Sequence, residues 1–520
     1  PRSFVRTLPR ADSEKSAIFF WELAPYCMFA CETGALLACA AYLLEDDLNA
    51  VSPFILTCIE DNLKRRILLP YLTAHFWWMG HDDEPMCNWT VWCTQNVLLT
   101  TFLMPWSVEM SSRLSSPVRT FCGNAPLFLP ENTSDTVVTL QAILHKAAES
   151  CDYFLKDYGN DGCCEEGAQY YRHAGLCLYG AMTVLNTVTD GHFDTLFRWD
   201  KVKNIASYIL NVHVNDKYYF NFADCSPIAG RAGVREYLFG KATGQEDLCL
   251  FAAKDFQAGQ GQLVTDEVNG GNLFYRMQTV FHYEELMQQN TSGTLSHRDV
   301  YYPSVGLFLV HSDTLDLAVK AGDNADSHNH NDTGSITLYK NGLPILADIG
   351  VETYTRKTFS PRRYEIWTMQ SGYHNLPTIC GTDQKDGVEY RAENVMTVLT
   401  VAEPSISMEL AAAYPAAQAI VPDLTYVRRV TLKKSSNTVV LEDHTNAQDV
   451  ILNFITYEKP VILSDGKLSI GEASASFEGA DLLAIETLPI TDARLKTAWD
   501  HDLYRIRLKG SDASFRLTIQ

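Results

Sequence analysis

The hydrophobic pattern changes its period part-way along the chain, and this change limits the fold more than any other feature. Up to about residue 290 apolar residues recur every three or four positions, as in the segment 136–158, which Asp135 is placed to cap and Gly159 to end. Beyond Asn290, strand-length segments rich in β-branched and aromatic residues alternate with turn signals such as Asn341-Gly342. The pattern predicts an α+β multidomain protein. We expect an N-terminal (α/α) toroid, an incomplete barrel, at residues 1–290, followed by a C-terminal antiparallel β-sandwich or supersandwich at residues 291–520.

The charge balance restricts the partners of the chain. Its 520 residues include 42 lysines and arginines against 63 acidic residues, a net charge of −21. Nucleic acid is excluded as the main partner, because binding it requires a basic surface. The most apolar stretch, residues 17–44, is interrupted by Glu22, Pro25 and Glu32, so no membrane span is expected. A polyanionic substrate would need a local basic patch that overrides the global field.

Cysteine usage bears on the compartment. The 14 cysteines are scattered and show no paired zinc spacing, which fits reduced, packed thiols better than a disulfide framework. This favours a cytoplasmic protein. The alternative is a secreted or periplasmic protein whose signal peptide has been removed, since the chain starts at Pro1.

The densest chemistry lies between residues 322 and 375. His328 and His330 would point to the same side of an extended backbone, and a hairpin with an Asn-Gly turn carries the chain on to Asp348. Tyr373-His374-Asn375 offers a further imidazole. Two neutral imidazoles and a carboxylate suit Zn²⁺, or Mn²⁺ if more oxygen ligands join. On spacing alone, a polar loop whose side chains satisfy one another is the simpler interpretation.

Three other segments carry candidate binding groups. The loop 354–364 holds four cations and no acid, and its arginines suit carboxylate or sulfate, although a solvated loop is an equal alternative. The helical half contains tryptophans and amides at 76–96 that suit sugar stacking but are more often core residues. The segment 161–173 places acids, tyrosines and a basic pair in a loop at a helix N-terminus.

Taken together, these segments resemble the heparinase II/III superfamily of polysaccharide lyases. The resemblance rests on His328-Asn329-His330-Asn331-Asp332-x-Gly334-Ser335, Asp348-Ile349-Gly350 and His374-Asn375, with weaker likeness at Asn88-Trp89 and Glu166-Gly167-x-x-Tyr170. It covers most of the chain and implies an (α/α) toroid joined to an antiparallel β-domain. It also implies cleavage of uronic-acid polymers by β-elimination.

The resemblance implies roles for individual residues. His330, Asp348 and His374 would be the ligands of one divalent metal ion, zinc or manganese, with a structural role. Tyr170 and His328 would be catalytic, Asn88 would neutralise the uronate carboxylate with Asn96 as a rival, and either Tyr354 or Tyr364 would match a further tyrosine of the family. His173 stands where many members carry a second tyrosine. The expected substrate-binding residues are Trp89, Trp92, Asn96, Glu166, Arg172, His173, Arg362 and Arg363.

The chemistry of β-elimination explains these residue types. The C5 proton of a uronate becomes acidic only when donors such as Asn88 or a protonated His328 stabilise the enolate-like intermediate. Tyr170 can act as base and then acid if nearby cations lower its pKa from the usual ~10. We therefore expect an EC 4.2.2 polysaccharide lyase acting on acidic polysaccharide, most of all glycosaminoglycans of the chondroitin, hyaluronan or heparan type, because the basic loop suits sulfate.

Three alternatives stay open. The first is a lyase of alginate or another polyuronate. The second is a glycoside hydrolase on the same toroid, which would use two carboxylates such as Asp161 and Glu166. The third is a carbohydrate-binding protein without turnover.

Overall fold

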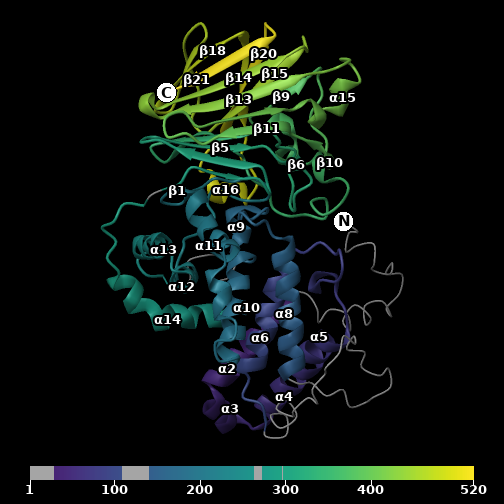
Figure 1. The fold of residues 1–520 in the computed structure, drawn as a ribbon, viewed down its shortest axis with the longest axis vertical. Helices are drawn as coiled ribbons and strands as arrows, with labels where there is room; N and C mark the ends of the chain where they lie inside the picture. Colours follow the sequence, from purple (N-terminus) through teal and green to yellow (C-terminus); the bar gives the residue numbers. More distant parts are fainter. Residues whose placement is uncertain (1–27, 108–139, 263–271, 296) are drawn as a thin grey trace. The chain divides into compact units, whose positions relative to one another are not determined.

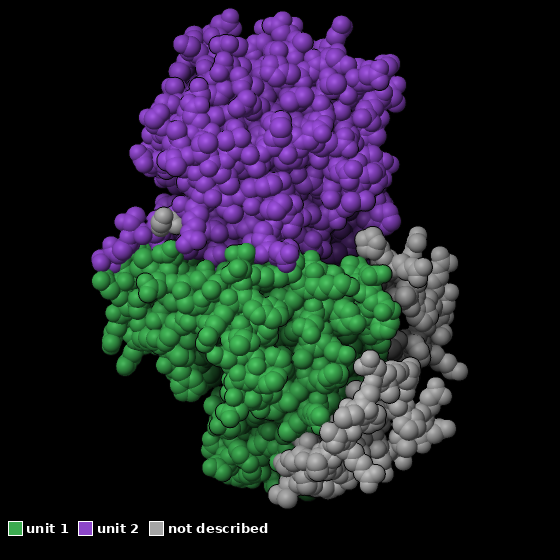
Figure 2. Space-filling model, viewed as in Figure 1, with its two compact units in different colours: residues 1–158, 172–206, 232–291 green, residues 159–171, 207–231, 292–520 purple. Residues whose placement is uncertain are grey.

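The computed structural model describes residues 28–107, 140–262, 272–295 and 297–520, and within them the chain forms two compact units. The helical unit comprises residues 1–158, 172–206 and 232–291, and the sandwich unit comprises residues 159–171, 207–231 and 292–520 (Figure 2). The long segment of the sandwich unit begins at Ser292, but two shorter segments from the first half of the sequence belong to it as well. As a result Tyr170 and His328 are part of the same unit.

Helices make up the helical unit, as the periodicity predicts. In α8 (Leu140–Asp157) the residues Ile143, Ala147, Cys151 and Phe154 are buried, which is the expected apolar stripe of an amphipathic helix. The residues 136–139 of that predicted helix lie outside the described part. By contrast, α6 (Asn88–Leu103) is buried along most of its length. The other helices of this half (Figure 1) are α2 (Met28–Leu43), α3 (Glu45–Val51), α4 (Phe54–Leu63), α5 (Leu69–Thr73), α10 (Gly175–Val188), α11 (Asp200–Val212), α12 (Val234–Thr243), α13 (Glu246–Ala258) and α14 (Leu273–Gln288).

Among the described residues, no helix by itself combines the length and the apolar composition that a membrane span needs. Helices α2 and α3 meet this requirement only when taken together, and they bend by 85° at their junction.

Two large antiparallel sheets dominate the sandwich unit, beside the two-stranded pairs β1-β2 and β10-β6. The eight-stranded sheet has the order β11-β12-β13-β14-β21-β18-β17-β16, and the nine-stranded sheet has the order β19-β20-β15-β8-β7-β5-β4-β3, with β9 paired to β15. The strands of the first sheet are β11 (Glu393–Val398), β12 (Ser405–Glu409), β13 (Tyr426–Lys433), β14 (Thr438–Thr445), β16 (Val461–Ser464), β17 (Lys467–Ile470), β18 (Ala473–Glu478) and β21 (Ser514–Ile519). Those of the second are β3 (Val300–Tyr302), β4 (Leu307–His311), β5 (Leu315–Lys320), β7 (Ile336–Lys340), β8 (Leu343–Leu346), β9 (Pro377–Ile379), β15 (Val450–Thr456), β19 (Ala480–Leu488) and β20 (Leu503–Gly510).

The core of this unit lies between the two sheets. One continuous buried cluster contains Leu317 and Leu338 from the nine-stranded sheet together with Val430, Leu441 and Leu517 from the eight-stranded sheet. Alternate residues of many strands enter this cluster, such as Leu315, Leu317 and Val319 of β5, which is the period-two pattern of the sequence.

The predicted Asn341-Gly342 hairpin is present, with one irregularity. Both turn residues have positive φ, 51° and 77°, and Lys340 pairs with Leu343 as expected. The register then shifts between Leu338 and Tyr339, so the ladder does not continue in the simple pairing that would place Asp348 opposite Ser335.

A buried ion pair ties the eight-stranded sheet to the loops beneath it. Arg428 and Asp443 face each other on β13 and β14, are 0% and 2% exposed, and make two hydrogen bonds of 2.9 and 2.8 Å. The same guanidinium donates to the backbone carbonyls of Gly334 and Asn375. It therefore fixes the two loops that carry the histidine motifs.

We predict that Asp443→Asn lowers the free energy of unfolding by about 3–5 kcal/mol, because it leaves the Arg428 charge buried without a counter-charge. Urea unfolding followed by circular dichroism measures this change. The matched control is Asp449→Asn, which breaks the pair of Asp449 with Lys509 on the surface and should cost about 1 kcal/mol or less. Equal losses of unfolding free energy in the two variants would contradict the stabilising role given to the buried Arg428–Asp443 pair.

Candidate active site and metal cluster

The candidate site is organised around the carboxylate of Asp224, which is 0% exposed. Its Oδ2 accepts hydrogen bonds from His328 Nδ1 at 2.8 Å and from the Tyr354 hydroxyl at 3.1 Å. Its Oδ1 accepts from His330 Nε2 at 3.1 Å and from Arg363 Nη2 at 2.5 Å. Burial alone would raise the pKa of Asp224, but the hydrogen bonds from the two histidines and the charge of Arg363 hold that pKa well below its usual range.

His328 is held in a constrained backbone conformation. Its φ is 60°, so the backbone is not extended there as the alternation argument assumed, yet His328 and His330 still reach the same carboxylate. Arg363 donates to the His328 carbonyl at 2.9 Å and so fixes this conformation. Because Asp224 accepts from Nδ1, the ring presents Nε2 on its other side, 3.4 Å from the Glu166 carboxylate. Burial lowers the pKa of His328, but the hydrogen bond to Asp224 and the charge of Glu166 outweigh it, and the net pKa is raised.

Tyr170, at the end of the short helix α9 (Gly167–Tyr171), stacks on His328 with ring centroids 4.6 Å apart. Its hydroxyl lies 2.5 Å from that of Tyr354. Since Tyr354 donates to Asp224, its oxygen accepts the proton of Tyr170. The condition for Tyr170 to act as a base, a pKa lowered by nearby cations, is not met: burial raises this pKa to about 12, although Tyr354 and Arg494 act in the opposite direction.

Arg494 supports the tyrosine pair from the loop before α16 (Leu495–Ala498). Its guanidinium lies 4.6 Å from the ring centroid of Tyr354, a cation–π contact, and donates to the Asp224 carbonyl at 3.0 Å. Asp492 accepts from the backbone N–H groups of both Thr353 and Arg494, and so holds the two loops together.

The two tyrosines that the sequence did not separate have different surroundings. Tyr354 belongs to the Tyr170–Asp224 chain, whereas the Tyr364 hydroxyl accepts a hydrogen bond of 3.0 Å from Asn329. Tyr364 thus supports the residue between the two histidines.

The predicted metal ligands come together. One donor atom each of His330, Asp348 and His374 lies within 4.8 Å of the others, and all three residues are buried. His330 Nδ1 has no hydrogen-bond partner in the described part of the chain, while its Nε2 donates to Asp224. His374 Nδ1 lies 3.0 Å from Asp348 and its Nε2 donates to the Thr368 carbonyl. A buried nitrogen lone pair with the opposite N–H already held is the arrangement of metal-binding histidines, so these residues fit a divalent ion.

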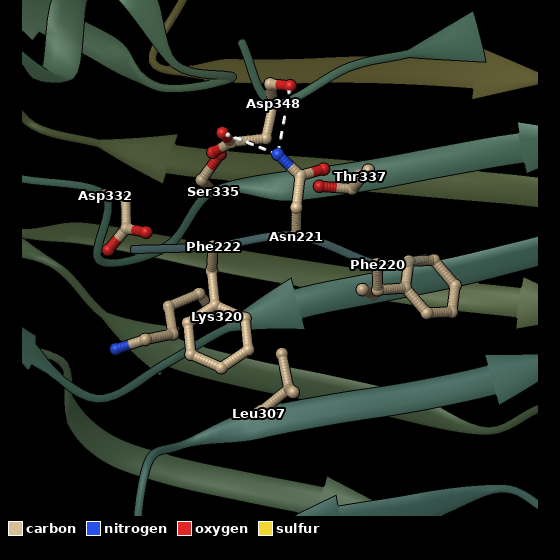
Figure 3. A pocket seen from close by; sticks show the side chains of 10 residues that line it. Phe220, Asn221, Phe222, Leu307, Lys320, Asp332, Ser335, Thr337 and Asp348 are labelled. Atoms are coloured by element: carbon tan, nitrogen blue, oxygen red, sulfur yellow. Dashed lines mark hydrogen bonds between the residues drawn. The ribbon is translucent and has the colours of Figure 1, made fainter. Parts of the chain in front are cut away.

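Asp348 is itself oriented by Asn221. The Asn221 amide donates to Asp348 Oδ1 at 3.1 Å and to its carbonyl at 3.3 Å, and the Gly350 N–H donates to Oδ1 at 2.8 Å. Figure 3 shows this contact beside a cavity of about 10 Å³, close to the size of a single water molecule. The carboxylate of the cluster is therefore held before any ion binds.

Glu166 and Tyr170 belong to the sandwich unit. The other catalytic and substrate-binding residues expected in the helical half belong to the helical unit. Asn88 and Trp89 begin α6, and Trp92 packs on His173 with ring centroids 4.1 Å apart. Asn96 donates to the Trp92 carbonyl and accepts a hydrogen bond from Asn272.

Three cations expected to bind substrate have protein partners instead. Arg172 is 2% exposed and paired with Glu236 at 3.3 Å. Arg362 is exposed but forms several hydrogen bonds to Glu365, an acid just beyond the segment that the sequence analysis considered, and Arg363 is paired with Asp224. The basic loop is therefore largely neutralised by acids whose proximity the local sequence did not reveal.

Sequence reasoning missed Asp224, Arg494 and Asn221. Asp224 lies in the stretch Phe220-Asn221-Phe222-Ala223-Asp224, which the sequence analysis assigned to the helical half. A signal was present, because a run of four aromatic residues at 218–222, interrupted only by Asn221, is typical of extended structure rather than of a helix. Nothing in the local sequence marks Arg494.

Comparison with known proteins confirms the resemblance for the C-terminal half. Residues 294–451 match the family described as Heparinase II/III-like, C-terminal, and this segment of the chain is a domain of that kind. It carries His328, His330, Asp348 and His374. None of the curated proteins matches the chain significantly in sequence.

Solved structures extend the likeness to the fold of the whole chain. A mutant of heparan sulfate lyase HepC from Pedobacter heparinus matches with a TM-score of 0.60 at 12% identity, covering 99% of this chain and 70% of that one. A second structure of heparan sulfate lyase HepC from the same organism gives 0.57 at 12%, with the same coverage. Chondroitin AC lyase from Streptomyces coelicolor A3, in complex with chondroitin sulphate, gives 0.51 at 10%, covering 94% and 66%. The predicted fold class, an α-toroid followed by an antiparallel β-sandwich, is confirmed.

We predict that Tyr170 keeps its proton throughout the neutral and mildly alkaline range, because burial raises its pKa to about 12. Phenolate absorbance of the wild type and of Tyr170→Phe should coincide on titration up to about pH 11, where a free tyrosine reference with a pKa of ~10 is mostly ionised. An extra phenolate in the wild type at or below the pKa of that reference would contradict this prediction.

Proposed function

We propose that the protein is a polysaccharide lyase that cleaves glycosaminoglycans by β-elimination and leaves a 4,5-unsaturated sugar. The single observation that carries this proposal is the stacked pair of Tyr170 and His328, in which His328 Nδ1 donates to the buried Asp224 carboxylate. An imidazole and a protonated phenol side by side can remove a proton from one atom and donate one to its neighbour.

The surroundings of each group favour a division of roles. His328 Nδ1 donates to Asp224, so in the neutral ring Nε2 is the lone-pair nitrogen, and it takes the C5 proton as base. The electrons of the C5–H bond form the C4–C5 double bond, and the C4–O4 bond breaks. Tyr170 keeps its proton, which it donates to Tyr354 when no substrate is bound, and it turns this proton to the departing O4. Tyr354 and Arg494 position Tyr170, and the role of Asn88 in neutralising the uronate carboxylate rests on the resemblance alone.

The choice of glycosaminoglycan over another polyuronate rests on the structural relatives. The similar structures are named as a heparan sulfate lyase and as a chondroitin AC lyase in complex with chondroitin sulphate. The basic loop contributes less than the sequence suggested, because Lys357 and Arg362 are paired with Glu365.

The hydrolase alternative is disfavoured by the state of its carboxylates. Both oxygens of Asp161 accept hydrogen bonds from Ser304, at 2.8 Å from the backbone N–H and 2.7 Å from the hydroxyl. Glu166 lies against His328. The histidine pair would have no role in a two-carboxylate hydrolysis.

We also propose that His330, Asp348 and His374 hold one divalent ion, zinc or manganese, with a structural role. Such an ion would supply charge that fixes the loop from His328 to His330. Asp224 accepts from His330 on one side and from His328 on the other, which connects that loop to the reacting groups.

We predict that Tyr170→Phe lowers kcat/KM for unsaturated product by about 10²–10⁴-fold, because the proton donor to O4 is lost. The assay is ultraviolet absorbance of the conjugated product with heparan sulfate, chondroitin sulfate and hyaluronan as substrates. Tyr364→Phe is the matched control, since it removes from the same unit a phenol hydroxyl that accepts a hydrogen bond from Asn329, and it should lose far less activity. New reducing ends without that absorbance would refute the lyase and favour a hydrolase.

We predict that His330→Ala lowers both metal content and melting temperature, because it removes one donor from a buried cluster. Elemental analysis after dialysis and a thermal melt measure the two effects. His444→Ala, a change of an exposed histidine that contacts Ser514, is the control and should alter neither. A stable His330→Ala protein with undiminished metal content would rule out the ligand assignment.

A further inference from the structure

A second histidine cluster lies in the sandwich unit and shares no residue with the first. His311 ends β4, Asp316 faces it across the ladder on β5, and His297 lies in the segment before β3. His311 Nδ1 and Asp316 Oδ1 are 2.8 Å apart, and the rings of His297 and His311 have centroids 5.0 Å apart at an angle of 67°. One donor atom of each of the three residues lies within 4.8 Å of the others.

The cluster contains a buried nitrogen that the protein leaves unsatisfied. His311 is 8% exposed, and its Nε2 has no hydrogen-bond partner within the described ranges. A buried polar atom without a partner destabilises the fold unless something outside the chain binds it. The proposed lyase chemistry makes no use of this residue.

The neighbouring groups leave the imidazoles able to bind a cation. The His297 ring packs against the rings of both His311 and His213, with centroids 5.0 and 6.0 Å away. His213 contacts the Asp216 carbonyl through its Nε2. The nearby Asp299 is committed to the His311 backbone N–H and to Lys434.

We propose that His297, His311 and Asp316 form a second metal site, with Zn²⁺ as the ion that fits best. Two imidazoles and one carboxylate form a common donor set for tetrahedral zinc, with water as the fourth ligand. Donor atoms in such a site are about 3.3 Å apart, so the present cluster needs only a small closure of its side chains.

The position of this site suggests a structural purpose. β3 is the last strand in the order of the nine-stranded sheet, and it lies next to β4, which in turn pairs with β5. An ion bound by His297 would attach the segment before this edge strand to the two strands that follow it. The first residues of the long sandwich segment would then be fixed against the sheet.

The test uses the full chain, stripped with a chelator and titrated with Zn²⁺ alone or with Co²⁺ as a spectroscopic probe. The wild type should bind one more equivalent of Zn²⁺ at micromolar concentration than His297→Gln. With Co²⁺, the visible absorbance of the tetrahedral ion should be lower in His297→Gln than in the wild type. His297 lies in a loop, so this variant should fold, and His311→Gln should show the same loss. The control His444→Gln should retain the wild-type number.

Failure of this proposal is distinguishable from failure of the first metal site. In the His330→Ala background, His297→Gln should still remove one equivalent. Equal binding by wild type and His297→Gln, or a difference seen only at millimolar Zn²⁺, would overturn the second site. Neither result would bear on the assignment of His330, Asp348 and His374.

Discussion

A single buried carboxylate holds the functional part of this protein together. Asp224 has no exposure to solvent, and an ionised group in that position is stable only if its charge and lone pairs are satisfied. Four donors do so, and each belongs to a different functional element: the histidine His328, the metal-cluster residue His330, the phenol Tyr354 and the loop cation Arg363. The geometry of the site is therefore a consequence of satisfying one charge.

The fold followed from the sequence because its two halves obey different periodicities. Burial on α8 and the alternation of the sandwich strands are direct results of the hydrophobic pattern. The short-range motifs were equally informative, since His328 and His330 do converge and His330, Asp348 and His374 do form a buried cluster. In each case the residues belong to segments whose local pattern restricts where the side chains can lie.

Partners distant in sequence could not be predicted in the same way. Asp224 is more than a hundred positions from His328, and Arg494 is 270 from the carbonyl that it contacts, so only the tertiary fold brings them together. The same reason explains Arg172, whose buried partner Glu236 is 64 residues away. The direction of the Tyr170 pKa shift could not be predicted either, because nearby cations are visible in a sequence, whereas the burial that outweighs them is not.

The most direct test of this account is to measure metal affinity and kcat together in Asp224→Asn. If one carboxylate orients both the catalytic imidazole and the metal-cluster histidine, kcat should fall and the affinity for Zn²⁺ should weaken by about 10–100-fold in the same variant. A variant that loses catalysis while binding Zn²⁺ as tightly as the wild type, or that loses Zn²⁺ affinity with kcat unchanged, would contradict the central role given to Asp224.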